Sequence, residues 1–277
     1  MSLSRRDFLG LSVKSIVVIG AGNILQSFAP GEFFLPSPEK VSLRFALASD
    51  GHYGEPNTKF ELHYDEMIGW LNREKKQRGV DFSMINGDLI HNDPAFLPTV
   101  KIKLDQLDMP YYVSHGNHDM VDGATWEETW KIPLHYAFEK KNSAFLILDT
   151  ADKAGKYICP DIEWTRKQLI RYSSKKQLFV FMHITPVDWT KNAIVCPELV
   201  ALFSKQVNLK AVFHGHDHDQ DSAKERDGKH YFFDSHIAGS WGTAYRGYRM
   251  VEVLTDGQVL TYQVNPTSAE KVNNHRV

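Results

Sequence analysis

The most constraining feature of the chain is a series of short apolar segments that each end in a polar residue. Five polar residues directly follow segments typical of buried strands: Asp50, Asp88, Asn117, His183 and His216. Helical patterns separate several of these segments, which predicts parallel β-α-β units. The carboxyl ends of parallel strands open onto one crevice, so these side chains are expected to meet there. The sequence therefore predicts an α/β fold with a polar site at the carboxyl ends of its strands.

The remaining pattern predicts a mixed sheet system. A short turn at Asp256 and Gly257 joins the last two apolar segments, which is typical of an antiparallel hairpin. Helices are expected from residue 60 to a Gly79 cap, around 96–104, over 162–172 and near 197–205. Strands are expected at 43–49, 82–86, 111–113, 144–148, 178–182, 210–213, 231–234, 248–254 and 259–264.

The composition excludes several classes of protein. The chain has 277 residues, of which 42% are hydrophobic and 24% charged, as expected of a soluble globular protein rather than a disordered one. Its formal net charge is -2 and it has no long basic run, so a nucleic-acid polymer is not an expected partner. The 13 histidines raise the question of whether some of them are spaced as metal ligands.

Five short motifs contain such a spacing. In an extended segment, alternate side chains point the same way, so Asp50 with His52, and His216 with His218, can face one site. Two carboxylates, one amide and four imidazoles are too many ligands for one tetrahedral ion, but they suit two ions that share a carboxylate. The motifs are Asp50-Gly51-His52, Gly87-Asp88, Gly116-Asn117-His118-Asp119, His183 and Gly215-His216-Asp217-His218.

These motifs, in this order, resemble those of the calcineurin-like metallophosphoesterase superfamily. The segments 146–149 and 161–169 also resemble, more loosely, its cyclic-nucleotide-phosphodiesterase branch. The resemblance implies a four-layer α/β/β/α sandwich with a dimetal site at one edge. It also implies Asp50, His52 and His218 as ligands of a first metal, Asp88 as a bridge, Asn117, His183 and His216 as ligands of a second metal, and His118 as general acid.

The activity implied by the resemblance is hydrolysis of a phosphate monoester or diester of a small molecule. A hydroxide held between the two metals would attack phosphorus while His118 protonates the leaving oxygen. The donor set contains no thiolate and is consistent with Mn, Fe or Zn. Two alternatives stay open: a nucleotide-type pyrophosphatase that uses the same site, and a catalytically silent binding domain.

One motif departs from the pattern of the protein phosphatases in this superfamily. Those enzymes have G-D-x-V-D-R-G, with an aspartate that orients the catalytic histidine and an arginine that binds phosphate. Here no arginine follows Asp88, which disfavours a protein-phosphatase activity. His91 occupies the place of the orienting aspartate, so Asp119 and Asp93 are candidates for that role. For His91 itself, contact with substrate phosphate and a simple loop position are both open.

Other residues have two interpretations each. His115 and His214 precede motif residues, and we interpret both as hydrogen-bonded neighbours of the site or core residues rather than ligands. The loop from Trp241 to Arg246 offers a stacking ring and a phosphate-facing cation, although an ordinary loop is the simpler reading. Cys159 and Cys196 each precede a proline, which places both in loops, where they either pair or stay as thiols.

The N-terminus resembles a twin-arginine export signal. Arg5 and Arg6 precede an apolar stretch, roughly 9–25, that is below the ~20 residues needed to span a bilayer comfortably. We therefore expect residues 1–29 to be a signal, 30–40 a linker, 41–266 the metallophosphoesterase domain and 267–277 a polar tail. The expected partners are the twin-arginine export machinery and a small phosphorylated substrate. Export beyond the cytoplasm is implied, with membrane attachment only through an uncleaved signal.

Overall fold

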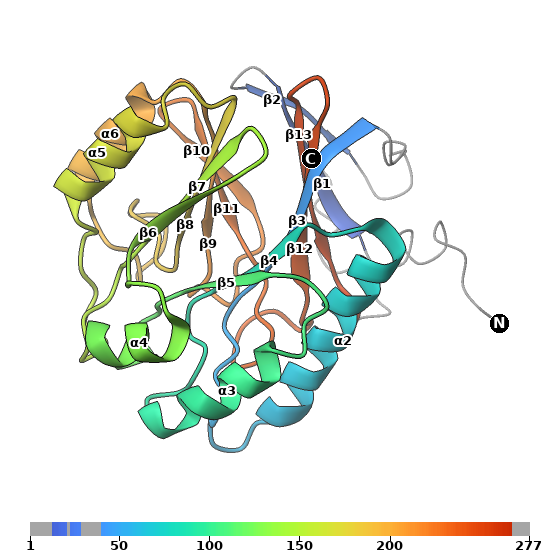
Figure 1. Cartoon of the computed structure of the whole chain (residues 1–277), viewed down its shortest axis with the longest axis vertical. Coiled ribbons are helices and arrows are strands. Elements are labelled where there is room, and N and C mark those ends of the chain that lie inside the picture. The colour runs from blue at the N-terminus through green and yellow to red at the C-terminus, as the bar shows by residue number, and fades with distance from the viewer. Residues whose placement is uncertain (1–12, 21–22, 29–39, 268–277) are drawn as a thin grey trace.

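Two β-sheets pack face to face between two layers of helices. The computed structural model describes residues 13–20, 23–28 and 40–267. Figure 1 shows the sheets side by side, with α2 (Phe60–Arg78) and α3 (Leu97–Leu104) outside one sheet and α5 (Ile162–Arg171) and α6 (Pro197–Lys205) outside the other. The predicted four-layer α/β/β/α sandwich with mixed sheets is confirmed.

The first sheet has seven strands in the order β2-β1-β13-β12-β3-β4-β5. Strands β3, β4 and β5 are parallel, whereas β12 pairs antiparallel with both β3 and β13. The strands are β1 (Val13–Gly20), β2 (Asn23–Phe28), β3 (Val41–Ala48), β4 (Phe82–Asn86), β5 (Tyr111–Ser114), β12 (Tyr248–Leu254) and β13 (Val259–Val264).

The second sheet has six strands in the order β10-β11-β9-β8-β7-β6. Its four central strands are parallel, and an antiparallel strand closes each edge. The strands are β6 (Tyr136–Lys140), β7 (Ser143–Leu148), β8 (Gln177–Met182), β9 (Leu209–His214), β10 (Ala223–Arg226) and β11 (Lys229–Phe233). The parallel strands of both sheets therefore end at loops that can converge.

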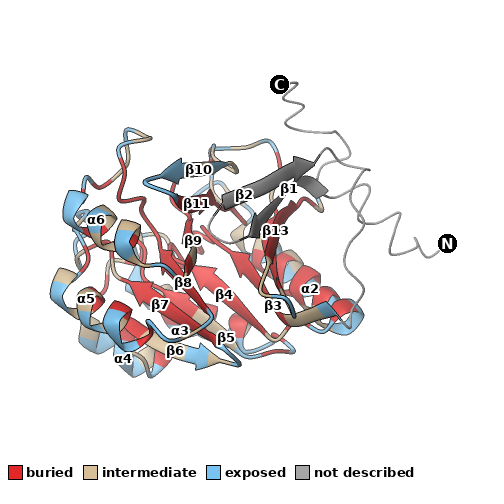
Figure 2. Cartoon of the chain, turned by 90° about the horizontal axis from the view of Figure 1, so that it is seen from above, coloured by how far each residue is buried: buried red, intermediate tan, exposed pale blue. Residues whose placement is uncertain are grey.

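Burial explains why the central strands are continuous apolar runs. The sequence of a strand that is covered on both faces is continuously apolar rather than alternating. Figure 2 shows these strands buried along most of their length. Phenylalanines fill the space between the sheets: Phe45 stacks on Phe82 with ring centroids 5.0 Å apart and meets Phe145 edge-on at 5.5 Å. Separate apolar clusters lie beneath the helices on either side.

The helix boundaries follow from local capping. Gly79 ends α2 in the left-handed conformation, at φ 76°, as the sequence predicts. Asp161 caps α5 by accepting a hydrogen bond from the Trp164 N–H at 2.9 Å, and Pro197 is the first residue of α6. A short 3₁₀ turn, η2 (Pro94–Phe96), leads into α3.

A network of buried charges links α2 to the first sheet. The Arg44 guanidinium donates to the Glu252 carboxylate at 2.7 Å across β3 and β12. Arg78, in the last turn of α2, pairs with Glu74 and lies 3.7 Å from Glu252. Tyr248 donates its hydroxyl hydrogen to Glu74 at 2.6 Å. We call Arg44, Glu74, Arg78 and Glu252 the ion network, in which each charge faces an opposite charge of the same chain.

Of helices α2 to α6 and strands β3 to β13, three were not predicted: α4 (Gly123–Trp130), β6 and β10. Helix α4 contains a glycine, two threonines and two tryptophans, all of low helix propensity, and it depends on the Asp122 cap and the two buried tryptophans. Strands β6 and β10 are short edge strands with exposed polar residues, so neither has the apolar run of a central strand.

The expected signal segment, 1–29, lies partly outside the described residues. Within it, β1 and β2 are strands, and β1 pairs with β13. The expected linker and polar tail fall almost entirely outside the described residues, so the division of the chain stays a prediction. Among the described residues, no helix is both long and apolar enough to cross a membrane.

Candidate metal centre

Six of the seven predicted ligands meet in one buried site, and the seventh, Asn117, is buried directly before His118, whose backbone N–H donates to Asp88. Asp50, Asp88 and Asn117 follow strands of the first sheet, and His183 and His216 follow strands of the second. The site therefore lies where the carboxyl ends of both parallel sets converge. None of the seven side chains is more than 7% exposed: Asp50, His52, Asp88, Asn117, His183, His216 and His218.

Three of these residues form a first group, Asp50, His52 and His218, whose ligand atoms lie within 4.8 Å of one another. The Asp50 Oδ1 atom is 3.2 Å from His218 Nε2 and 4.0 Å from His52 Nε2. The two Nε2 atoms are 3.0 Å apart. A carboxylate oxygen and two imidazole nitrogens thus converge from two loops, as the ligands of one cation do.

A second group has the same composition: Asp88, His183 and His216. The Asp88 Oδ2 atom is 3.1 Å from His183 Nε2, and it is also 3.5 Å from His52 Nε2 in the first group. Asp88 therefore lies between the two groups, where the predicted bridging carboxylate belongs. Its other oxygen accepts a hydrogen bond from the backbone N–H of His118 at 2.8 Å.

Several atoms of the site are buried without a hydrogen-bond partner. Among the described residues these are Asn117 Oδ1 and His216 Nε2, whereas Asp88 Oδ2 and His183 Nε2 face only each other and neighbouring candidate ligands, at 3.1 Å from one another. A buried polar atom without a partner costs free energy, so such atoms are rare unless a ligand or ion completes them. Carboxylate, amide and imidazole donors suit hard to borderline cations. The residues present therefore fit a pair of metal ions.

Hydrogen bonds on the far side of each ring orient the ligand nitrogens. His183 donates from Nδ1 to the Asn86 carbonyl at 2.8 Å, and His218 donates from Nδ1 to the Trp241 carbonyl at 3.2 Å. Each bond fixes the tautomer with Nε2 free toward the site, the usual arrangement for metal-binding histidines. His236 and Trp241 also stack on the two faces of His218, with ring centroids 5.0 and 4.6 Å apart.

The backbone around the site is strained. Asp50, His52, Asp88 and His216 all have positive φ angles, between 40° and 67°. Non-glycine residues rarely adopt this conformation, and such strain is typically retained at functional sites. A side chain at Gly116 would place its Cβ 2.2 Å from the Asp88 backbone nitrogen. Glycine is therefore required there for the Asp88 and Asn117 loops to approach each other.

The charges of the site perturb one another. Burial alone would raise the pKa of both Asp50 and Asp88, but the neighbouring histidines lower the two pKa values below the usual range. Burial lowers the pKa of His52 to about 3 and that of His216 to about 4. Burial also lowers the pKa of His183, but the negative charges of Asp88 and Asp50 outweigh this effect and raise its pKa to about 10. Without metal, a proton on His183 thus takes the place of a cation.

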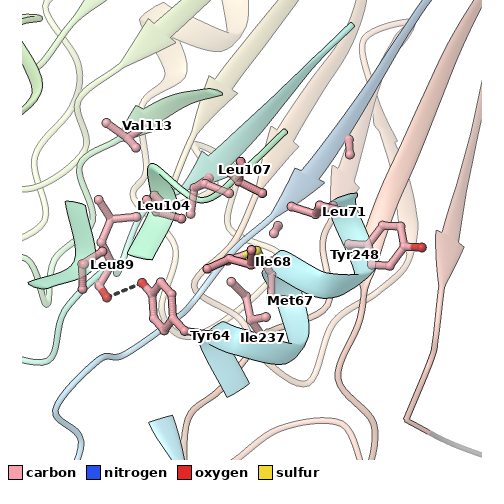
Figure 3. Close-up of a cluster of buried hydrophobic side chains, with 14 of the residues drawn as sticks. Tyr64, Met67, Ile68, Leu71, Leu89, Leu104, Leu107, Val113, Ile237 and Tyr248 are labelled. Carbon is pink, nitrogen blue, oxygen red and sulfur yellow. Dashed lines mark hydrogen bonds between the residues drawn. The ribbon is translucent and has the colours of Figure 1, made fainter. Parts of the chain in front are cut away.

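The core beneath α2 supports the Asp88 loop. Figure 3 shows Tyr64 of α2 pointing toward Leu89, and its hydroxyl donates a hydrogen bond to the Leu89 carbonyl. Asp119, predicted as a possible orienting acid, acts on the same loop. Its Oδ1 accepts from the backbone N–H groups of Leu89 and Ile90, and its Oδ2 accepts from that of Gly116. Burial raises the pKa of Asp119 to about 6.

The ring of His118 is held by Asn92, which the sequence analysis missed. The His118 Nδ1 atom donates to Asn92 Oδ1 at 2.7 Å. Both oxygens of Asp119 are used by backbone groups, and Asp93 caps η2 through the Ala95 N–H. The expectation that one of these aspartates orients His118 is therefore wrong. Nothing in the residue type distinguishes Asn92 from any exposed loop asparagine, so only the fold shows this contact.

His91 lies at the rim of the site beside His118. The two rings stack with centroids 4.8 Å apart, and His91 Nδ1 is 3.1 Å from His52 Nδ1. A nitrogen of each of His52, His91 and His118 lies within 4.8 Å of the others. Both His91 and His118 are partly exposed. His91 therefore lies beside His52 and His118, and its contact with substrate phosphate stays a prediction.

The remaining candidates lie away from the chemistry. His115 hydrogen-bonds Asp149 at 2.9 Å, and His214 hydrogen-bonds the Met182 carbonyl at 3.1 Å, so both are supporting residues as interpreted. Arg246 pairs with Glu66 at 2.6 Å and its side chain is therefore committed to α2 rather than to a phosphate. Trp241 is half exposed but stacks on His218, as already described.

A family comparison agrees with this geometry. The model of the calcineurin-like phosphoesterase family matches residues 43–220, more than half of the chain, and includes all seven candidate ligands. The chain belongs to the calcineurin-like phosphoesterase family. It is accordingly a metal-dependent phosphoester hydrolase. No curated protein matches the chain.

Solved structures share the fold at low sequence identity. A dimetal phosphatase from Danio rerio is 13% identical with a TM-score of 0.60, and the match covers 77% of this chain and 96% of that one. The Plasmodium inner-membrane-complex anchor GAP50 is 15% identical with a TM-score of 0.61, covering 86% and 89%. The Haemophilus influenzae NAD nucleotidase is 14% identical with a TM-score of 0.53, covering 81% of this chain but 50% of that one. Such identities establish the fold alone.

Proposed function

We propose that the protein hydrolyses a phosphate monoester or diester of a small molecule at this site. The observation that carries the proposal is the buried set of unpaired oxygen and nitrogen atoms beside a partly exposed histidine. The buried atoms are suited to binding metal ions. The partly exposed histidine is suited to proton transfer to a substrate that arrives from solvent.

The roles of the residues follow from their positions. Asp50, His52 and His218 would hold one ion, and Asn117, His183 and His216 the other, with Asp88 between them. When bound, the ions, Mn, Fe or Zn, would screen the phosphoryl oxygens and supply activated water.

His118 is placed to donate the proton that the leaving group needs. Asn92 accepts from its Nδ1, so Nε2 is the nitrogen that faces away from this contact and exchanges the proton. The ring contacts His52, with centroids 4.9 Å apart, which places the acid next to the first metal group. His118 itself is not needed as a ligand, because both three-residue groups are complete without it.

A small substrate fits the departures in the motifs. The motif has no arginine after Asp88 that could bind phosphate. Arg246 is paired with Glu66 and is therefore not available for this role either. The net charge of -2 offers no broad attraction for a polyanion. Recognition would therefore depend on the metals, on His91 and on the loops around the site.

The test is a rate comparison between p-nitrophenyl phosphate and bis-p-nitrophenyl phosphate with Mn, Fe and Zn. His118→Ala should keep both metals and lose about 10²–10⁴-fold in rate, most for poor leaving groups. His135→Ala is the matched control, because His135 stacks on Trp164 away from the metal groups. A preference for nucleotide diphosphate compounds would assign a pyrophosphatase instead. No hydrolysis of any ester with any metal would leave only the silent binding domain.

We also propose that the protein is exported by the twin-arginine route. The Arg5-Arg6 pair and the apolar stretch behind it support this. The disulfide between Cys159 and Cys196 supports it independently, because disulfides persist in oxidising compartments. Replacing both arginines by lysine should keep the protein in the cytoplasm, as judged by cell fractionation. Unchanged export of that variant would contradict the proposal.

A further inference from the structure

A small hairpin loop, residues 150–158, lies next to the second metal group. Ala151 and Tyr157 form an isolated antiparallel bridge, and the Ile158 N–H donates to the Thr150 carbonyl at 3.0 Å. The Asp152 N–H donates to the Lys156 carbonyl at 2.9 Å, which closes the tip. The base is anchored as well, since Thr150 Oγ1 accepts from the Ile184 N–H at 3.2 Å, directly after His183.

The loop packs against two of the candidate ligands. A Cβ at Gly155 would lie 2.6 Å from the Asn117 carbonyl oxygen, so the tip of the loop rests on that residue. The Tyr157 ring meets the His216 ring edge-on, with centroids 5.0 Å apart and an interplanar angle of 88°. This places Tyr157 at the second metal group, whereas His118 lies beside His52 of the first.

A disulfide holds the loop in this place. Cys159 is two residues beyond Tyr157 and bonds to Cys196, with the Cα atoms 5.9 Å apart. Cys196 is buried and precedes α6, and its N–H donates to the Pro186 carbonyl at 3.2 Å. The bond therefore joins the loop that follows β7 to the segment that follows β8 and His183. Both ends of the tether lead back to the metal site.

The exposure of Tyr157 is not explained by packing. Its side chain is 38% exposed, and within the described ranges its hydroxyl has no hydrogen-bond partner. A tyrosine that served only to cover His216 would gain nothing from an open hydroxyl. A phenolic O–H, in contrast, is a good donor to an anionic oxygen.

We propose that Tyr157 is a substrate-binding residue that donates its hydroxyl hydrogen to a phosphoryl oxygen at the second metal group, and that the Cys159–Cys196 disulfide holds it there. The inference rests on the proposed function, because it assigns the phosphoryl group to the same site. It places donors at both ends of the bound phosphate: Tyr157 beside His216, and His118 on the side of His52. The ligand chemistry is that of a phosphoryl dianion or monoanion, not of a particular ester.

The experiment measures binding of inorganic phosphate to the metal-loaded protein by calorimetry, together with kcat and KM on p-nitrophenyl phosphate. Tyr157→Phe should weaken phosphate binding about tenfold, the effect of one hydrogen bond to a charged oxygen. It should keep two metals per chain. Tyr111→Phe is the matched control. Tyr111 is the first residue of β5, at the end of the strand away from the site, and its hydroxyl donates to Asp105. Phosphate binding should not change in this variant.

The tether is tested with the Cys159→Ser and Cys196→Ser double variant and, in parallel, with wild-type protein reduced until two thiols are titrated. Either form should weaken phosphate binding about tenfold with metal content unchanged, and adding Tyr157→Phe should have little further effect. Unchanged phosphate affinity in Tyr157→Phe overturns the contact. Unchanged affinity in both the reduced protein and the double variant overturns the tether.

The outcomes separate this inference from the proposed function. If wild-type protein binds phosphate but hydrolyses no ester, and Tyr157→Phe binds it tenfold more weakly, the contact stands and the proposed function fails. If wild-type protein hydrolyses esters and Tyr157→Phe matches it in phosphate affinity and in KM, the proposed function stands and the contact fails.

Discussion

Two regions of the molecule bury charges in opposite ways. In the ion network, Arg44 and Glu252 approach to 2.7 Å and Arg78 pairs with Glu74, so each charge is compensated within the chain. In the metal centre, two aspartates face imidazoles whose ordinary state is neutral, so no arginine or lysine of the described residues balances their charge there. Side chains in both regions are almost fully buried.

The difference separates stability from function. A buried ion pair that is complete in itself helps to hold α2 on the first sheet, and it needs nothing from solution. A buried group of carboxylates whose countercharge is a proton on His183 can exchange that proton for a cation from solution. The ion network should therefore respond to mutation through the free energy of unfolding. The metal centre should respond through metal content and activity.

The largest expected effect is that of Asp88→Asn. The substitution removes the bridging charge that lies 3.1 Å from His183 and 3.5 Å from His52. Transition-state stabilisation by the metals is worth several kcal/mol, so ester hydrolysis should fall by roughly 10³-fold or more. Elemental analysis should find metal lost as well. A variant that keeps both metals and the wild-type rate would break the comparison.

Glu252→Gln tests the other region. It leaves Arg44 without a full countercharge in a buried position, and breaking such a pair costs about 3–5 kcal/mol. Urea unfolding should show this loss in the free energy of unfolding. Metal content per folded chain and kcat should stay at the wild-type level. Loss of metal from folded Glu252→Gln protein would show that the two regions are not independent.

Chelation sharpens the comparison further. Removing metal from wild type should lower the free energy of unfolding by about 2.7 kcal/mol relative to protein at one hundred times the metal dissociation constant. The same treatment should not change the free energy of unfolding of Asp88→Asn.

Metal affinity should also depend on pH. The carboxylates raise the pKa of His183 to about 10, and its proton must leave when an ion binds, so metal affinity should decrease as pH falls below that value. Calorimetry in buffers of different ionisation enthalpy measures the proton release.

The smallest effect should come from Asn92→Ala. Asn92 acts on the reaction only through His118, and removing such an orienting contact typically costs about 10–100-fold. The rate should fall most for esters with poor leaving groups, and Asn92→Asp should restore much of it because a carboxylate accepts the same hydrogen bond. Equal losses for good and poor leaving groups would mean that Asn92 is merely structural.

The parts of the molecule that the sequence predicts are those determined by long apolar patterns. Strands β4, β12 and β13 and helix α6 have the predicted bounds, since full burial requires uninterrupted apolar residues. Six of the seven predicted ligands meet in two adjacent groups because strand ends converge. Helix α4 and the edge strand β10 were not predicted, because capping and edge pairing rather than apolar pattern define them.

The finer features of the site depend on tertiary contacts between loops. The exposed Asn92 meets His118 across 26 residues of sequence, and the disulfide joins cysteines 37 residues apart. The sequence left that disulfide as one of two possibilities, and it placed the orienting role on aspartates that in fact support the Asp88 loop and cap η2. Loop positions carry no periodic signal, so residue type alone does not determine such pairs.

Metal stoichiometry tests the central claim most directly. The claim is that the unpaired buried atoms around Asp88 bind two cations. Metal-free protein, titrated with Mn under anaerobic conditions in a calorimeter, should bind two ions per chain, and Asp88→Asn should bind fewer under the same conditions. Wild-type protein that binds less than one ion per chain, or an Asp88→Asn variant that binds two as tightly as wild type, would contradict the account.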